Sequence, residues 1–144
     1  YLSKYSSSKK NLEYILKKKI RRLSDIKRIR FELYKEIETI ITKLEKLKLI
    51  NDQLFTETKI QSLLNQAKSK NFIKQYLLQK GVSNHLIEEQ LSIFYENKQD
   101  IERESALKFA KKRNLLNNDI NYEKKLSKMA RAGFSYEISK DILK

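Results

Sequence analysis

The sequence predicts an all-α protein built from tandem units. The chain of 144 residues has no proline and only two glycines, so it offers few residues that break helices. Apolar residues recur along it at the three- and four-residue spacing of amphipathic helices. The two glycines share one local pattern, Lys80-Gly81-Val82-Ser83 and Ala132-Gly133-Phe134-Ser135, each between two helical segments. A pattern that occurs twice in this way indicates a repeat.

Each glycine pattern predicts the end of one helix and the start of the next. Glycine is the residue that most readily takes the left-handed conformation that closes a helix. The apolar residue after it can pack back onto the last turn, as in a Schellman motif, and the serine can cap the next helix. We therefore expect Gly81 and Gly133 to be structural helix stops.

The first third of the chain is expected to hold one long helix. Residues 1–5 read as the end of a preceding helix, and Ser6-Ser7-Ser8 as a break and a cap. From Ser8 the apolar residues stay in one helical phase, which predicts a continuous helix to about Arg30. The residues that set this phase are Leu12, Ile15, Leu16, Leu23 and Ile26.

Further helices follow in order, separated by caps, joins and the glycine stops. We expect them over residues 31–48, 54–68, 69–80, 83–94, 100–113, 122–132 and 135–143. Asn51 or Asp52, Asp100 and the loop Asn117-Asn118-Asp119 are the expected caps. With the N-terminal segment this gives three groups of three: repeat one over 1–50, repeat two over 51–98 and repeat three over 99–144. The first group has Lys19 where the others have glycine, and extra residues between Arg22 and Phe31.

The ordered motifs resemble those of the RecX family of recombinase regulators. The resemblance rests on three places and extends over most of the chain. They are Leu49-Ile50-Asn51-Asp52 with Phe55, then Ile73, Leu77 and Lys80-Gly81-Val82, and finally Leu126, Met129, residues 131–136 and Ile138. Ser8 followed by Leu12 fits the first repeat of the family more weakly. Lys48 and Lys19 depart from the family pattern, which usually has a glycine at both positions.

The resemblance implies a fold and a function. The fold would be an elongated, curved stack of three three-helix repeats, with a first repeat that is N-terminally truncated or atypical. The partner would be the RecA nucleoprotein filament on single-stranded DNA, whose ATPase and strand-exchange activities the protein would inhibit without being an enzyme. The alternative function is a basic helical protein that binds nucleic acid through phosphate contacts without RecA.

Charge provides the candidate binding residues. The net charge is +14, which favours an acidic partner, although lysine enrichment from an AT-rich genome would produce part of it without function. Lys10, Lys17, Arg21 and Arg28 fall close together on the far side of the expected first helix. Basic residues crowd this region, with Asp25 as the only acid between Lys17 and Arg30. The first candidate set is Lys10, Lys17, Lys18, Arg21, Arg22 and Arg28.

A second basic set lies in the last third of the chain. By helical phase, one row lies opposite the apolar face of its expected helix, and a basic run precedes it by one loop. The set consists of Lys111, Lys112, Arg113, Lys124, Lys128 and Arg131. Both sets have an alternative interpretation as solvated outer faces of helices.

No catalytic, metal or cofactor site is indicated. His85 has no second ligand type near it, and Glu88 and Glu89 are adjacent, so they point in different directions on a helix. There is no phosphate-binding glycine loop and no nucleophile motif. The absence of cysteine and of a long apolar run is compatible with a cytoplasmic protein that does not enter the membrane. We expect a monomer, with Tyr136 as the most exposed aromatic residue.

Overall fold

The fold consists of helices alone in the part of the chain that the structure describes. In this computed structural model the described residues are 1–96, 100–117 and 119–144. These ranges contain eight helices and no strand, which confirms the all-α prediction. The helices are α1 (Lys9–Leu23), α2 (Lys27–Lys46), α3 (Asp52–Asn65), α4 (Lys70–Gln79), α5 (Asn84–Glu96), α6 (Ile101–Lys112), α7 (Tyr122–Arg131) and α8 (Tyr136–Leu143).

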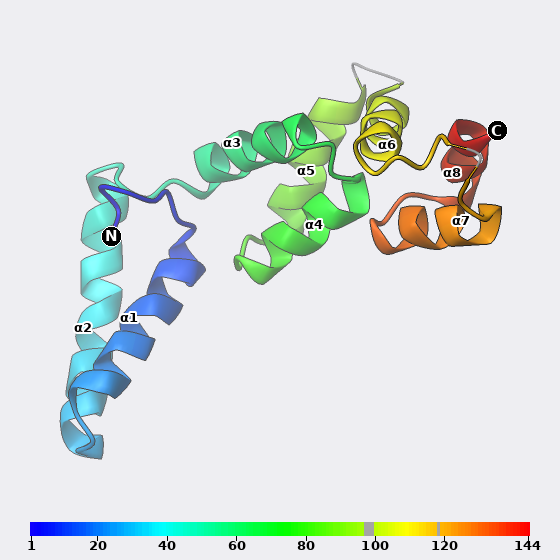
Figure 1. Ribbon diagram of the computed structural model, residues 1–144. Helices are drawn as coiled ribbons and strands as arrows, with labels where there is room; N and C mark the ends of the chain where they lie inside the picture. The colour runs from blue at the N-terminus through cyan, green and yellow to red at the C-terminus, as the bar shows by residue number, and fades with distance from the viewer. Residues whose placement is uncertain (97–99, 118) are drawn as a thin grey trace.

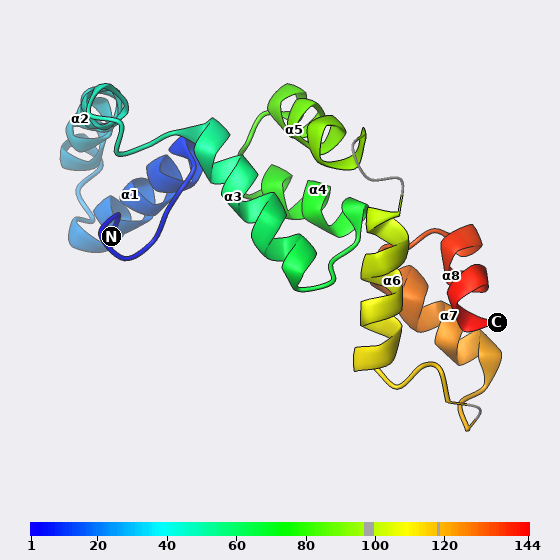
Figure 2. The same cartoon turned by 90° about the horizontal axis from the view of Figure 1, so that it is seen from above.

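The helices form three units that follow one another along a bent, elongated array (Figures 1 and 2). We name α1 and α2 the first unit, α3 to α5 the second unit, and α6 to α8 the third unit. The main helix–helix contacts stay within a unit: α1 packs on α2, α3 and α4 pack on α5, and α6 and α7 pack on α8. This arrangement is typical of repeat proteins, in which each unit contacts only its neighbours.

Each unit closes its own apolar core. In the first unit the buried residues are Leu12, Ile37, Ile41 and Ile50. In the second unit they are Phe55, Ile60, Leu63, Ile73, Leu77, Val82, Ile87 and Leu91. In the third unit they are Ala106, Ala110, Leu115, Met129, Phe134 and Leu143. Among the described residues, the cores of the second and third units are separate clusters, so the geometry of the array depends on how neighbouring units are joined.

Both glycines end helices as predicted. Gly81 and Gly133 have φ angles of 75° and 90°, in the left-handed region. The N–H of Val82 donates to the Leu77 carbonyl, and the N–H of Phe134 donates to the Met129 carbonyl. These are the bonds of a Schellman motif, and they place Val82 and Phe134 back on the cores. The structural role expected for both glycines is therefore observed.

Three further helices end in the same way without glycine. Lys48, Ala67 and Asn114 have φ angles of 55°, 60° and 53°, and each is followed by a Schellman bond to the preceding helix. A left-handed residue with a side chain costs roughly 1–2 kcal/mol, so sequence patterns do not announce such stops. Lys48 therefore keeps the helix end that the family usually builds with glycine.

The expected helix from Ser8 to about Arg30 is wrong in its extent. Helix α1 ends at Leu23, and α2 begins at Lys27 after an extended break at Ser24. The Ser24 hydroxyl accepts the N–H of Ile26, which offers the backbone an alternative to the helical bond. Leu23 and Ile26, which were expected in the core, are 71% and 60% exposed. The helical phase that Leu23 and Ile26 share with the apolar residues of α1 therefore does not indicate burial.

The first unit is atypical, as the sequence indicated. Its described residues form two helices. Residues 1–5 form a single turn, in which the backbone N–H of Tyr5 donates to the Tyr1 carbonyl. Lys19 lies inside α1, which runs on past the position of the missing glycine. The predicted boundary between repeats two and three, at 98 and 99, falls outside the described residues.

Most expected caps are observed. The side chains of Asn51, Ser83 and Ser135 accept the N–H groups of Leu54, Leu86 and Ile138. Asp100 lies at the N-cap of α6 but makes no side-chain capping bond. The cap of α7 is Asn121, not the predicted loop 117–119, of which Asn118 lies outside the described residues.

Candidate functional site

Neighbouring units are joined by a bonding pattern that occurs twice. At the first joint, between the first and second units, the buried Ser8 hydroxyl donates to the carbonyl of Lys80. At the second joint, between the second and third units, the buried Ser69 hydroxyl donates to the carbonyl of Ala132 at 2.6 Å. Each serine also caps its own helix, and each accepting carbonyl directly precedes a glycine stop. One hydroxyl thus links a helix start in one unit to a helix end in the next.

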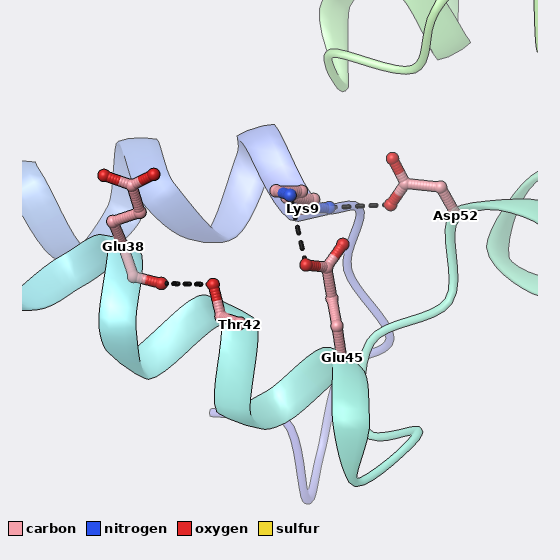
Figure 3. A network of polar contacts seen from close by, with 5 residues as sticks. All are labelled: Lys9, Glu38, Thr42, Glu45 and Asp52. Atoms are coloured by element: carbon pink, nitrogen blue, oxygen red, sulfur yellow. Dashed lines mark hydrogen bonds and ion pairs between the residues drawn. The ribbon is translucent and has the colours of Figure 1, made fainter.

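A carboxylate completes each joint. At the first joint the Lys9 N–H donates to Asp52 Oδ1 at 2.8 Å, and the Lys9 ammonium lies 3.1 Å from a Glu45 carboxylate oxygen (Figure 3). At the second joint the Lys70 N–H donates to both Glu102 carboxylate oxygens, at 3.1 and 2.9 Å. An acidic side chain at the N-terminus of a helix is stabilised by the helix dipole.

The second joint also perturbs two titrating groups. The Tyr95 hydroxyl donates to Glu102 at 3.2 Å, and the Lys70 ammonium lies 4.9 Å from the Tyr95 ring centroid. Burial raises the pKa of Glu102 above its ordinary value, although the hydrogen bonds from Lys70 and Tyr95 act in the opposite direction. Burial and the neighbouring Glu102 carboxylate raise the pKa of Tyr95. Glu102 therefore has a polar role inside the joint and is not a free surface acid.

The glycines at the joints are needed for space as well as for conformation. A Cβ at Gly81 would lie 2.5 Å from the Lys10 Cβ, and a Cβ at Gly133 would lie 2.5 Å from the Ser69 hydroxyl oxygen. Both distances are far below a van der Waals contact. Each helix stop is therefore also the place where the preceding unit comes into closest contact, and Lys10 has a packing role at the first joint.

The first basic set does not form one row on one helix. Arg28 lies on α2, because the break at Ser24 separates it from the α1 members. Lys17 is ion-paired with Glu13 at 2.5 Å, and Arg28 with Glu32 at 3.6 Å. The Arg21 Nε lies 3.4 Å from the Tyr34 hydroxyl. The set thus covers both helices of the first unit; its exposed members are Lys10, Lys18, Arg21, Arg22 and Arg28.

The second basic set is partly gathered at the second joint. All six members are exposed, and three of them, Arg113, Lys128 and Arg131, line a groove of about 360 Å³. Lys111, Lys112 and Lys124 are not part of its lining. The second unit contributes Ala67, Lys68 and Phe72 to the groove, and Lys68 and Phe72 were not expected in any site. We name this groove the second-joint groove; its lining is Ala67, Lys68, Phe72, Phe109, Arg113, Lys128, Arg131 and Ala132.

Within the described ranges, the structure contains no arrangement suited to metal binding. No three His, Cys, Asp or Glu side chains gather there in a way that could hold an ion. His85 is exposed in the first turn of α5. Glu88 is paired with Lys74, which lowers the pKa of the Glu88 carboxyl through their hydrogen bond. Among the described helices, none has the length and apolar character needed to cross a membrane.

Comparison with known proteins agrees with this architecture over nearly the whole chain. The model of the second three-helix domain of RecX matches residues 51–91. The regulatory protein RecX of Myxococcus xanthus is 26% identical over 152 residues, which cover 99% of this chain and 80% of that protein. The crystal structure of RecX from Lactobacillus salivarius covers 99% of this chain and 87% of its own, with 29% identity and a TM-score of 0.67. In sequence and in structure, the chain resembles RecX proteins along nearly its whole length.

Other RecX proteins match over different extents. The proteins of Streptococcus uberis and Streptococcus agalactiae are 34% and 33% identical over 110 and 111 residues. This chain spans only 41% and 42% of their lengths. A second RecX crystal structure has a TM-score of 0.71 at 22% identity, which supports the fold alone. These relatives are named regulatory proteins, and the chain has the three-helix repeat array of the RecX structures.

Proposed function

We propose that this protein binds the RecA filament on single-stranded DNA and inhibits its ATPase and strand-exchange activities. The observation that carries the proposal is the RecX likeness along 99% of the chain, in sequence and in structure. Inhibition would come from occupying the filament in the cytoplasm, without any chemical step on the regulator.

The shape and the charge of the molecule support this proposal. The bent array extends its three units in sequence, so that one chain can contact several subunits of a filament (Figure 1). A net charge of +14 favours association with an acidic protein surface or with DNA phosphates. Both basic sets lie largely on exposed faces and leave the cores unaffected. A long cationic array is suited to bind along a large acidic assembly.

The test is the ATPase activity of RecA on single-stranded DNA, with the purified protein added at increasing ratios. We expect ATP hydrolysis to fall until the filament is saturated. No inhibition at any ratio would overturn the proposal. The titration is repeated with a large excess of DNA over RecA. A filament inhibitor still lowers ATP hydrolysis under these conditions, whereas a protein that only sequesters free DNA no longer does.

A second candidate function is nucleic-acid binding without RecA. It is favoured by the exposed cations of the first unit, where Lys18 and Arg22 have no acidic partner within ion-pair distance among the described residues. This function predicts tight binding to oligonucleotides whose affinity falls steeply as salt rises. Neutralising Lys17, Arg21 and Arg28 together should then abolish binding. Weak oligonucleotide binding with persistent filament inhibition would exclude it.

A further inference from the structure

The second-joint groove combines cations from two units around an apolar floor. Lys68 and Phe72 come from the second unit, and Arg113, at the C-cap of α6, and Lys128 and Arg131, on α7, come from the third. Ala67 and Ala132 contribute apolar surface between them, and no acidic side chain is part of the lining. A concave apolar site with a few charged groups at its rim is the usual form of a binding site.

The aromatic rings of this groove already hold cations. The Lys68 ammonium lies 4.5 Å from the Phe72 ring centroid, and the Arg113 guanidinium lies 5.9 Å from that of Phe109. These contacts keep the two charges beside the apolar floor. They also occupy one face of each ring, which reduces the area on which a nucleic-acid base could stack. The rings therefore act as apolar walls and not as open stacking platforms.

The size of the groove indicates its occupant. A volume of about 360 Å³ accommodates a few side chains but not a length of nucleic-acid strand. The guanidinium groups of Arg113 and Arg131 suit carboxylates, with which they can form paired hydrogen bonds. We propose that the second-joint groove binds an acidic segment of a protein partner. One apolar side chain of that segment lies between Phe72 and Phe109, and its neighbouring carboxylates pair with Arg113, Lys128 and Arg131.

An equivalent groove at the first joint supports this assignment. It has a volume of about 300 Å³, and its lining again combines cations and aromatic rings without an acid. The residues are Tyr1, Lys4, Tyr5, Ser6, Asn11, Phe55, Lys59, Tyr76 and Lys80. The Lys59 and Lys80 ammonium groups lie 5.8 and 5.6 Å from the ring centroids of Phe55 and Tyr76.

The two grooves occupy corresponding positions in the repeat. Asn11 and Phe72 each follow their joint serine by three positions, and Tyr76 and Lys128 each precede their glycine stop by five. A cationic, aromatic groove is thus a property of the joint itself. A partner that presents acidic segments at intervals, such as an assembly of identical subunits, would fill both grooves; this extension rests on the proposed function.

The test uses a fluorescein-labelled glutamate-rich peptide with one central leucine, and its binding is followed by fluorescence anisotropy. The double substitution Lys128→Glu and Arg131→Glu should weaken binding about tenfold or more, because it places two acids where carboxylates dock. The matched control, Lys19→Glu with Lys27→Glu, makes the same change in net charge on exposed positions outside both grooves and should leave the affinity within about threefold. Replacing the leucine of the peptide by serine should also weaken binding about tenfold.

Three outcomes would overturn the proposal. They are equal losses in the two double variants, no effect of the leucine, and tighter binding of an oligothymidylate that the groove substitutions abolish. The last result would assign the groove to nucleic acid. Far-UV circular dichroism verifies folding, and Lys128→Gln with Arg131→Gln replaces the charge reversal if that variant unfolds. RecA is absent from the assay, so failure of the groove and failure of filament inhibition are separate results.

Discussion

The hydroxyl of Ser69 donates a 2.6 Å hydrogen bond to the carbonyl oxygen of Ala132, which lies in the next unit of the array. The same hydroxyl accepts the N–H of Phe72 at 3.2 Å and so caps α4. One buried side chain therefore stabilises a helix start and fixes the distance to the neighbouring unit. This double role distinguishes it from an ordinary helix cap.

Replacing Ser69 by alanine should lower the free energy of unfolding by about 2 kcal/mol. The change removes a capping bond, worth about 1 kcal/mol, and leaves the Ala132 carbonyl without its donor. Ser135→Ala is the matched control, because the Ser135 side chain caps α8 and, among the described residues, makes no hydrogen bond to another unit; it should cost about 1 kcal/mol. Urea unfolding followed by circular dichroism measures both. Equal costs would show that the joint bond contributes nothing.

Replacing Gly133 by alanine should destabilise the protein by more than the roughly 1–2 kcal/mol of a left-handed alanine. The added Cβ would lie 2.5 Å from the Ser69 hydroxyl oxygen, so the joint must open. Asn114→Ala provides the control, since Asn114 is an exposed left-handed stop whose Schellman bond, from Leu115 to Ala110, lies within the third unit. In the double variant Gly133→Ala with Ser69→Ala the clash is relieved. The free energy of unfolding lost in the double variant should therefore be smaller than the sum of the losses in the two single variants. Strict additivity in urea unfolding would contradict the predicted contact.

Lys48→Gly should stabilise the protein by about 1 kcal/mol, because glycine takes the left-handed conformation without the penalty of a side chain. Lys48 has a φ of 55° and is exposed, so no core contact is lost. Lys46→Gly, inside the last turn of α2, should have the opposite sign, since glycine weakens a helix interior. The midpoints of thermal unfolding compare the two variants. A lower midpoint for Lys48→Gly would show that Lys48 makes a compensating contact.

The contribution of Glu102 to the free energy of unfolding should increase as the solution becomes mildly acidic. Its pKa in the folded protein is raised above the ordinary value of 4.5, so the folded state holds the proton more tightly. This contribution is complete below pH 4.5 and is lost as the pH rises through the raised pKa. The stability difference between the wild type and Glu102→Gln should therefore grow between pH 7 and pH 4.5.

Glu88→Gln is the control of opposite sign for the pH experiment. The pKa of Glu88 is lowered by its bond with Lys74, so its contribution is present above pH 4.5 and is lost only as the pH falls through the lowered pKa. Urea unfolding at a series of pH values measures both variants. A stability difference for Glu102→Gln that shrinks on acidification would mean that the hydrogen bonds from Lys70 and Tyr95 outweigh the effect of burial.

The sequence was sufficient for the helices whose ends carry distinctive residues. Gly81 and Gly133 predicted the ends of α4 and α7, and the capping serines predicted the starts of α4, α5 and α8, because few residue types suit those conformations. The break at Ser24 could not be predicted in this way, since the apolar residues on either side of it keep a helical phase. Leu23 and Ile26 then turned out exposed, so periodicity alone overstated the core of the first unit.

The candidate site was predictable only in part, for a related reason. Arg113, Lys128 and Arg131 stood out as charges on helical faces, but Lys68 and Phe72 belong to another unit. Their proximity results from the Ser69 bond to Ala132, which joins positions 63 apart in the chain. A pattern within one helix contains no information about such a contact. The positions of Lys68 and Phe72, four residues apart and on either side of the joint serine Ser69, are the signal that the sequence held.

The separate cores determine how the molecule can deform. Changing the angle between the second and third units would leave both of their cores packed and would alter the serine, carboxylate, glycine and groove contacts of that joint. Strain imposed from outside is therefore concentrated at two short places, and the array follows a curved surface by two discrete bends. The curvature that it tolerates is set by Ser8, Ser69 and the two glycines, whose hydroxyls and backbone face the neighbouring unit.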